Sequence, residues 1–332
     1  MNVNSSPEKV LLEGNLRPQT WDEYIGQSRV KKNLQIIIEA AKQRGDSLEH
    51  LLFYGNPGLG KTTLAQVVAH TMEGDLKICS APTLEKTGDV ASLLTNLKDG
   101  DILFMDECHR LHKSVMETLY SAMEDFKLHI IMGRGPMARA MELNLPKFTL
   151  IGATTRMALL PAPFRNRFGA IFQLNFYENK DIEAIVQRSS NILGIPVEAG
   201  AIQAIATRAR FTPRVANRIL KRVRDYATIE ANEPRITQDV ALRALEFLEI
   251  DELGLEAGDR KILETMVNKF EGGPVGIQTL AAAAAEEPDT IYDVYEPYLL
   301  QLGFIERTPR GRVVAPIAYK HLGIQHSQKE LL

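Results

Sequence analysis

A glycine-rich stretch constrains the fold of this chain more than any other feature. Residues 55–62 read GNPGLGKT and fit the pattern G-x-x-x-x-G-K-[ST]. The apolar run 51–54 before it predicts a buried strand, and the apolar spacing over 62–72 after it predicts a helix. In that context, backbone N–H groups of the loop and the start of the helix bind phosphate oxygens. The sequence therefore predicts a P-loop in an α/β domain that binds and hydrolyses ATP.

Two acidic residues follow another predicted strand and complete the expected catalytic centre. The apolar run 102–105 ends in Asp106 and Glu107. In P-loop enzymes a carboxylate at such a strand end holds Mg²⁺. We assign Lys61 to the β- and γ-phosphates, Thr62 and Asp106 to Mg²⁺, and Glu107 to the polarisation of the attacking water. A strand that ends in a solvated acidic turn is the alternative, and the preceding P-loop disfavours it.

The order of the predicted elements divides the chain into regions of different class. Apolar runs at 51–54, 102–105 and 148–151 alternate with helical patterns, which is typical of a parallel sheet covered on both faces. After about residue 176 the pattern is helical, over 181–193, 201–209, 213–231 and 238–245, and an acidic linker follows at 251–258. Helices from 260, 277 and about 289 and a hairpin at 304–314 then form a winged-helix pattern.

Three further positions could act on the phosphates, although each is ambiguous taken alone. Thr155 could contact the γ-phosphate or cap the end of a strand. Arg165 and Arg167 lie in a proline-bounded turn, and an arginine supplied across an interface can stabilise the charge of a phosphoryl transition state; a surface salt bridge is the alternative. Arg214 faces the same choice, but the helix dipole disfavours a cation at a helix start, which modestly favours an anionic ligand.

A cluster of arginines near the C-terminus is the candidate DNA site. Arg307, Arg310 and Arg312 lie on one tight turn, in the sequence RTPRGR. Such a turn suits contacts to phosphates in a groove, and a solvated charged turn is the alternative. The formal net charge of the chain is −3, so DNA binding must come from a local cluster of this kind.

Cysteine content and hydropathy point to the cytoplasm. The chain has 2 cysteines, Cys79 and Cys108, whose spacing fits no metal motif and is expected of reduced thiols. No apolar run of about 18 residues could span a membrane. The polar first residues lack the apolar core of a signal peptide.

Taken together, these motifs resemble those of the AAA+ ATPases and, more closely, of the RuvB-type Holliday-junction branch-migration ATPases. The resemblance runs from about residue 16 to residue 322, and the most specific stretch is RTPRGR, because many families share the P-loop. Asn56, Cys108, Arg134 and Pro288 depart from the family pattern, and the last two could alter contacts to the partner or to DNA. The other matching stretches are LRP (16–18), YIGQ (24–27), DECHRL (106–111), MED (123–125), GATTR (152–156), RNRFG (165–169), TPR (212–214) with RVRDY (222–226), and EPY (296–298).

The resemblance implies a fold of three domains. They are an AAA+ P-loop parallel-sheet domain (1–176) with a protruding hairpin at about 127–145, a small helical lid domain (177–252) and a C-terminal winged helix (253–325). A tail, 326–332, is expected to be disordered.

The resemblance also assigns roles at the nucleotide. Thr155 would be the first sensor of the γ-phosphate and Arg214 the second. Arg167 would be the finger that reaches the ATP of a neighbouring subunit, with Arg165 as the other candidate. The residues expected to bind ATP or ADP are Leu16, Arg17, Gly58, Gly60, Lys61, Thr62, Thr63, Glu124, Asp125, Phe126, Tyr177 and Arg214.

The activity implied is that of a helicase-like DNA translocase. A homohexamer would encircle duplex DNA and drive branch migration of Holliday junctions in recombination and repair, together with a RuvA-type junction-binding protein and, in a larger complex, a RuvC-type resolvase. The RuvA-type partner would dock on the hairpin at 127–145. The apolar residues of that hairpin either face the partner or pack inward; they are Leu128, Ile130, Met132, Met137 and Met141.

Two rival functions stay open at this point. A clamp-loader subunit is the nearest AAA+ alternative, but several of these carry a zinc ribbon with two C-x-x-C pairs, which two cysteines cannot supply, and they lack a C-terminal wing. An ATP-gated DNA-binding protein, which uses nucleotide only to assemble, is the alternative from another class.

Overall fold

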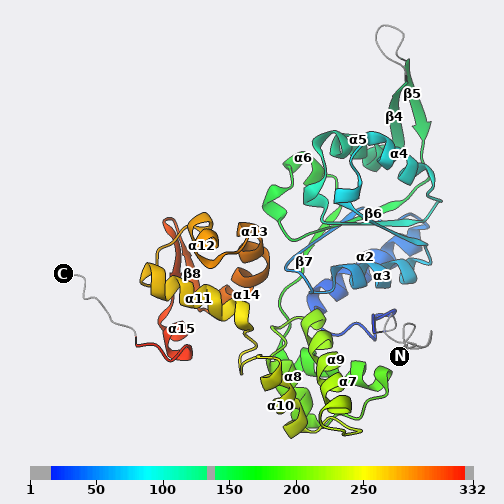
Figure 1. The fold of residues 1–332 in the computed structure, drawn as a ribbon. Helices are drawn as coiled ribbons and strands as arrows, with labels where there is room; N and C mark the ends of the chain where they lie inside the picture. The colour runs from blue at the N-terminus through cyan, green and yellow to red at the C-terminus, as the bar shows by residue number, and fades with distance from the viewer. Residues whose placement is uncertain (1–15, 133–138, 326–332) are drawn as a thin grey trace, which may run out of the picture. The chain divides into compact units, whose positions relative to one another are not determined.

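The computed structural model describes residues 16–132 and 139–325. Two compact units make up the chain: the first ends at Tyr177 and the second begins at Glu178 (Figure 1).

A parallel sheet forms the centre of the first unit, as predicted. Its strand order is β2-β3-β6-β1-β7, and every neighbouring pair runs parallel. Strand β6 is buried along its whole length, and β1 and β3 are buried up to their last residues, Tyr54 and Asp106, as expected for a sheet that is covered on both faces. The strands are β1 (Leu51–Tyr54), β2 (Leu76–Ser80), β3 (Ile102–Asp106), β6 (Thr149–Thr154) and β7 (Ala170–Gln173).

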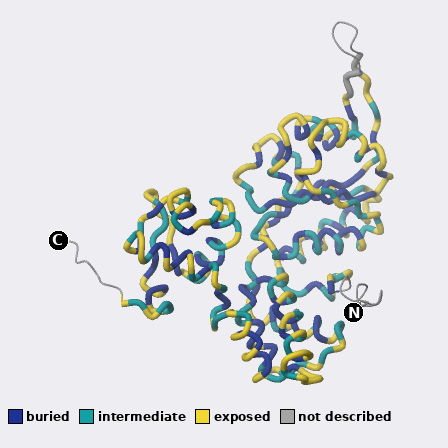
Figure 2. Tube along the Cα trace, viewed as in Figure 1, coloured by how far each residue is buried: buried dark blue, intermediate teal, exposed yellow. Residues whose placement is uncertain are grey.

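Helices cover both faces of this sheet. Figure 1 shows α2 (Ser28–Arg44) and α3 (Lys61–Met72) on one face. The other face carries α4 (Thr87–Thr95), α5 (Lys113–Glu124) and α6 (Ala162–Arg165). Buried apolar side chains of β3, β6, α4, α5 and α6 form one core cluster, and Figure 2 shows the strands buried between these layers.

Both cysteines belong to this sheet region and are free thiols. Cys108 is fully buried in the core cluster beneath α5. Burial raises the pKa of the Cys108 thiol and raises that of Cys79 to about 12, so both thiols stay protonated near neutral pH. Cys108 therefore acts as a small apolar side chain, as an aliphatic residue would at this position.

A separate two-stranded hairpin extends from the sheet domain (Figure 1). Strand β4 (Lys127–Met132) pairs antiparallel with β5 (Arg139–Asn144). Leu128 is buried and Met141 is 41% exposed, so one of these apolar residues packs inward and the other faces outward. The predictions for Ile130, Met132, Arg134 and Met137 fall on side chains outside the described residues.

The second unit starts with the four predicted lid helices. They are α7 (Asn179–Leu193), α8 (Ala199–Thr207), α9 (Pro213–Ile229) and α10 (Gln238–Phe247). Ile219, Leu220, Val223 and Ala227 form the buried face of α9, which matches the helical spacing seen in the sequence. Thr212 occupies the N-cap position, but its hydroxyl donates to the Ala209 carbonyl oxygen instead of accepting from the helix.

A winged helix completes the second unit. Helix α11 (Ala257–Phe270) begins three residues before the predicted start at 260, so the linker is shorter than expected. The third helix starts as α13 (Pro288–Thr290), continues through a π-helical turn, Ile291–Tyr295, and runs on as α14 (Glu296–Gln301). Pro297 lies in the first turn of α14 and does not interrupt the helix. The remaining elements are α12 (Ile277–Ala284), β8 (Ile305–Thr308), β9 (Gly311–Val314) and α15 (Pro316–His321).

His50 lies in the core of the first unit and predicts a pH dependence of stability. Its Nδ1 accepts from the Leu150 backbone N–H at 2.9 Å, and its Nε2 lies 3.0 Å from the Met123 carbonyl oxygen, to which the neutral ring donates. Burial lowers the pKa of His50, and the hydrogen bond to Met123 only partly opposes this. The unfolded chain therefore binds this proton more readily than the folded one.

We expect the free energy of unfolding to fall as pH drops below about 6.5, the ordinary pKa of histidine, by up to about 1.4 kcal/mol per pH unit. Denaturant unfolding between pH 7.5 and 5.5 measures this slope. His50→Gln should reduce the slope, and the exposed His70→Gln should leave it unchanged. Equal slopes in both variants would contradict the assignment.

Candidate functional site

The P-loop joins β1 to α3 and follows a path that requires glycine. Gly55 has φ 146°, and a Cβ there would lie 2.5 Å from the Leu174 carbonyl oxygen. Gly60 has φ 94° and is the N-cap of α3. A Cβ on Gly60 would lie 3.1 Å from the hydroxyl oxygen of Tyr24. The loop is thus a closely fitted backbone cradle at a helix N-terminus, which suits the phosphates of a nucleotide.

Lys61 is held inside this loop. Its Nζ donates to the carbonyl oxygens of Gly55, at 2.8 Å, and Asn56, at 3.0 Å. Only 7% of the residue is exposed. Asn56 contributes only its backbone here, so its departure from the family pattern does not remove this contact.

The acidic pair lies where the carboxyl ends of β3 and β6 meet. These two strands are neighbours in the sheet. Asp106 is the last residue of β3, and its Oδ1 accepts from the Glu107 backbone N–H at 3.0 Å. The Thr155 hydroxyl donates to Glu107 Oε2 at 3.2 Å. The two residues assigned to the attacking water and to the γ-phosphate therefore contact each other directly.

His109 also contacts Glu107, and sequence reasoning missed it. Its Nδ1 lies 3.2 Å from Glu107 Oε2 and 2.9 Å from the Thr154 hydroxyl oxygen. The side chain is 7% exposed. Its position two residues after Glu107 could have indicated this contact. A short 3₁₀ turn, Cys108–Arg110, follows the strand end and places the His109 ring beside Glu107.

Tyr177 lies against the P-loop. Its hydroxyl donates to the Leu59 carbonyl oxygen at 3.2 Å and lies 3.4 Å from the Tyr24 hydroxyl. Burial, with the neighbouring Tyr177 hydroxyl, raises the pKa of Tyr24 well above its usual value, so the Tyr24 phenol acts as a neutral hydrogen-bonding group. Of the other residues expected to bind ATP or ADP, Leu16 is buried and Arg17 is exposed.

Arg167 is fixed within its own subunit by contacts with α5 and α6. Its guanidinium donates to the Pro163 carbonyl oxygen at 2.6 Å, pairs with Glu124 at 3.1 Å and lies 4.1 Å from the centre of the Tyr120 ring. Its Nε is buried and makes no hydrogen bond to the part of the chain that the structure describes. Glu124 is thus the partner of Arg167.

The two residues after Glu124, which are also expected to bind nucleotide, have different surroundings. Asp125 is exposed. The Phe126 ring packs against those of His50 and Phe148.

Two of the three wing arginines are tied to one buried carboxylate. Arg307 Nε lies 2.7 Å from Glu296 Oε1, and Arg312 forms two hydrogen bonds to the same carboxylate, at 2.9 and 3.1 Å. The side chain of Glu296 is 0% exposed, that of Arg312 16% and that of Arg307 45%. Burial alone would raise the pKa of Glu296, but the two guanidinium groups outweigh burial and hold it below its usual range.

Alanine substitutions at Arg310 and at Arg312 should therefore have different effects. Arg312→Ala removes two charge-assisted hydrogen bonds to a buried carboxylate and should lower the free energy of unfolding by about 1.5–3 kcal/mol. Arg310 is exposed at the tip, so Arg310→Ala should change stability by less than about 0.5 kcal/mol and reduce the salt dependence of DNA binding by about one unit of slope. Denaturant unfolding and DNA titrations at several salt concentrations measure the two effects. Equal stability losses would contradict the distinction.

The described residues contain no helix long and apolar enough to span a membrane. They also hold no group of three or more His, Cys, Asp or Glu side chains suited to a metal ion.

Comparisons with known proteins match most of the length of this chain. Three family models match consecutive parts of the chain: the Holliday junction DNA helicase RuvB P-loop domain at 16–174, the RuvB AAA lid domain at 177–251 and the RuvB C-terminal winged helix domain at 252–323.

Similar proteins cover nearly the full length. A Holliday junction branch migration complex subunit RuvB from Dehalococcoides mccartyi is 56% identical over 315 residues, which is 95% of this chain and 90% of that protein. One from Chloroflexus aggregans is 54% identical over 331 residues, covering 100% and 94%. The solved Thermotoga maritima RuvB Holliday junction branch migration motor is 48% identical, with a TM-score of 0.86, over 93% of this chain and 99% of that one.

Proposed function

The chain belongs to the RuvB family, and from that membership we propose that it is the ATP-driven motor of a branch-migration complex, which moves Holliday junctions in DNA recombination and repair. The observation that carries the proposal is the contact of Glu107 with Thr155 at the strand ends. The P-loop that encloses Lys61 lies in the same sheet domain. These contacts support ATP hydrolysis as the activity of a chain that also carries a winged helix.

Each residue of this site has a distinct task in hydrolysis. Gly58, Gly60, Lys61 and Thr63 bind the phosphates through the loop and the first turn of α3. Thr62 and Asp106 would hold Mg²⁺, which would supply charge neutralisation at the phosphates.

Glu107 then takes up the proton of the attacking water. The Thr155 hydroxyl and His109 fix the direction of the Glu107 carboxylate, so that its position is set before the water arrives.

Other residues act on the adenosine moiety and across subunits. Leu16, Arg17 and Tyr177 line the adenine and ribose, and Arg214 senses the γ-phosphate of its own subunit. Arg167 reaches the ATP of the next subunit in a homohexamer, with Glu124, Asp125 and Phe126 beside it. The exposed Glu124 and Asp125, and the ion pair that orients Arg167, support this assignment.

The partners follow from the same proposal. Arg307, Arg310 and Arg312 contact the phosphates of duplex DNA, and a RuvA-type protein docks on the hairpin at 127–145. A RuvC-type resolvase acts on the same junction in a larger complex. DNA as substrate and two protonated free thiols support a cytoplasmic location.

Sustained turnover distinguishes a motor from a protein that uses ATP only to assemble on DNA. We expect duplex DNA to stimulate steady-state ATP hydrolysis through many turnovers per subunit, and we expect Lys61→Ala to abolish it. An ATP-gated DNA-binding protein would instead hydrolyse about one ATP per binding event. That outcome would contradict the motor.

A further inference from the structure

The turn between α8 and α9 has an unusual backbone. Arg210 and Phe211 follow one another with φ values of 52° and 54°, a left-handed conformation that non-glycine residues rarely adopt. Thr212 and Pro213 then start α9, and Arg214 lies in its first turn. Such a conformation persists only where the surrounding contacts hold it. Whatever holds Arg210 therefore fixes the start of the helix that carries Arg214.

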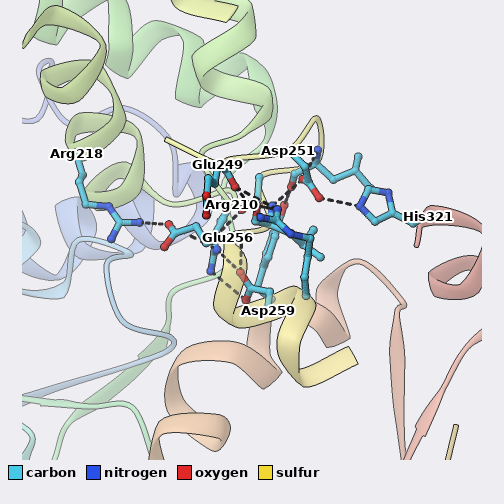
Figure 3. A network of polar contacts seen from close by, with 12 residues as sticks. Arg210, Arg218, Glu249, Asp251, Glu256, Asp259 and His321 are labelled. Atoms are coloured by element: carbon cyan, nitrogen blue, oxygen red, sulfur yellow. Dashed lines mark hydrogen bonds and ion pairs between the residues drawn. The ribbon is translucent and has the colours of Figure 1, made fainter. Parts of the chain in front are cut away.

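The contacts that hold Arg210 come from the winged helix (Figure 3). Its Nε donates to the Gly254 carbonyl oxygen at 2.9 Å, and its Nη2 forms a short ion pair with Asp259 of α11. Its guanidinium lies 5.2 Å from the centre of the Tyr298 ring of α14. The side chain of Arg210 is 10% exposed and that of Asp259 0%. The turn before α9 is thus fixed by a buried ion pair.

A second contact holds α9 on the other side of Arg214. Arg218, one turn along the helix, pairs with Glu256, which also lies 3.6 Å from Arg210. Arg214 and Arg218 are four apart and lie on the same face of α9. In sequence, Arg214 is therefore flanked by two arginines, Arg210 in the preceding turn and Arg218 in the helix, that both contact the start of α11. Arg214 itself is exposed.

The same elements lead to the DNA-binding wing. Tyr298, beneath Arg210, lies in α14 two residues after Glu296, the carboxylate that holds Arg307 and Arg312. Its hydroxyl donates to the Leu253 carbonyl oxygen. Ion pairs from the wing to Glu296, the α14 backbone from Glu296 to Tyr298, and the contact of the Tyr298 ring with Arg210 therefore connect the wing to the turn before Arg214, all within the second unit.

We propose that Arg210 and Arg218 are positioning residues that couple the DNA-binding wing to Arg214, so that duplex DNA bound at the wing changes the affinity of the chain for ATP. This inference rests on the proposed function, in which Arg214 senses the γ-phosphate. Because such coupling is reciprocal, bound ATP changes the affinity for DNA by the same factor.

The test is the ratio of two dissociation constants. The affinity of the full chain for a slowly hydrolysed ATP analogue is measured with and without saturating duplex DNA. We expect a ratio of about fivefold or more in the wild type, in the usual range for coupled sites. Arg218→Gln and Arg210→Lys should bring the ratio close to one. Lysine keeps the charge of Arg210 but lacks its forked geometry.

Two controls separate coupling from folding. Arg218 is 55% exposed at its side chain, so Arg218→Gln should fold and should bind DNA and the analogue separately with nearly wild-type affinity. Arg243→Gln removes the same charge from an ion pair within α10, with Asp239, and should keep the wild-type ratio. A purely structural role would lower the melting temperature and leave the ratio intact.

Two results would overturn the inference. One is a wild-type ratio that persists in Arg218→Gln and Arg210→Lys. The other is a wild-type ratio of one in a chain that still hydrolyses ATP in a Lys61-dependent manner. In both cases the proposed function stands, whereas loss of Lys61-dependent hydrolysis removes the proposed function by a separate measurement.

Discussion

Replacing Arg167 by alanine should lower steady-state ATP hydrolysis about 10³–10⁵-fold, the usual contribution of an arginine finger. Glu124, the Pro163 carbonyl oxygen and the Tyr120 ring fix this guanidinium, while its buried Nε makes no hydrogen bond among the described residues. A fixed cation loses little entropy when it meets a phosphate. The variant should still bind ATP.

A matched control is available in the same turn. Arg165→Ala removes an equal charge two residues away and should keep most of the activity if Arg167 is the finger. A large loss in Arg165→Ala with little change in Arg167→Ala would reverse the assignment.

Mixing experiments test whether the finger acts across subunits. Arg167→Ala keeps its own Glu107, and Glu107→Gln keeps its own Arg167. Hydrolysis between subunits therefore predicts that two inactive preparations regain activity when they assemble together. A mixture as inactive as its components would place the finger and the acid at the same subunit's ATP.

Glu107→Gln should lower hydrolysis about 10²–10⁴-fold, the range for removal of a general base, with little change in ATP affinity. Glutamine keeps the shape of the side chain and can still accept the hydrogen bond from Thr155, but it cannot take up a proton from water. Single-turnover hydrolysis and binding of a fluorescent ATP analogue measure the two effects.

The control for this variant is Glu117→Gln on α5. Glu117 lies near Lys113, at 3.9 Å, and its side chain is 56% exposed, so its loss should leave hydrolysis unchanged. If Glu107→Gln turned over ATP at the wild-type rate, another group would be the base.

The sequence predicts the elements whose residues are buried one after another, as in the central strands of the sheet. The runs in β1 and β3 are apolar throughout because both faces of the central strands are covered. The edge strands β2 and β7 were missed because they are short and only partly buried; Ile78 and Ile171 are 54% and 43% exposed. Helix α2 was missed although Val30, Leu34, Ile38 and Ala41 form its buried stripe.

The site was predictable in its residue types and less so in its contacts. The glycines, the lysine and the strand-end acids could be predicted as site residues, because few other residue types can bind phosphate and Mg²⁺ in this pattern. Pairings between distant positions carry no such signal. Sequence alone could not show that Glu296 would neutralise two wing arginines, or that Arg210 would pair with Asp259, 49 residues away.

The central claim is tested most directly with a synthetic four-way junction that has long homologous arms. The junction is incubated with ATP, Mg²⁺ and the protein, with and without a RuvA-type partner, and the yield of two-stranded products is followed against Lys61→Ala. We expect dissociation that requires Lys61 and increases with the partner. ATP hydrolysis without any junction processing, even with a matched partner, would contradict the branch-migration motor.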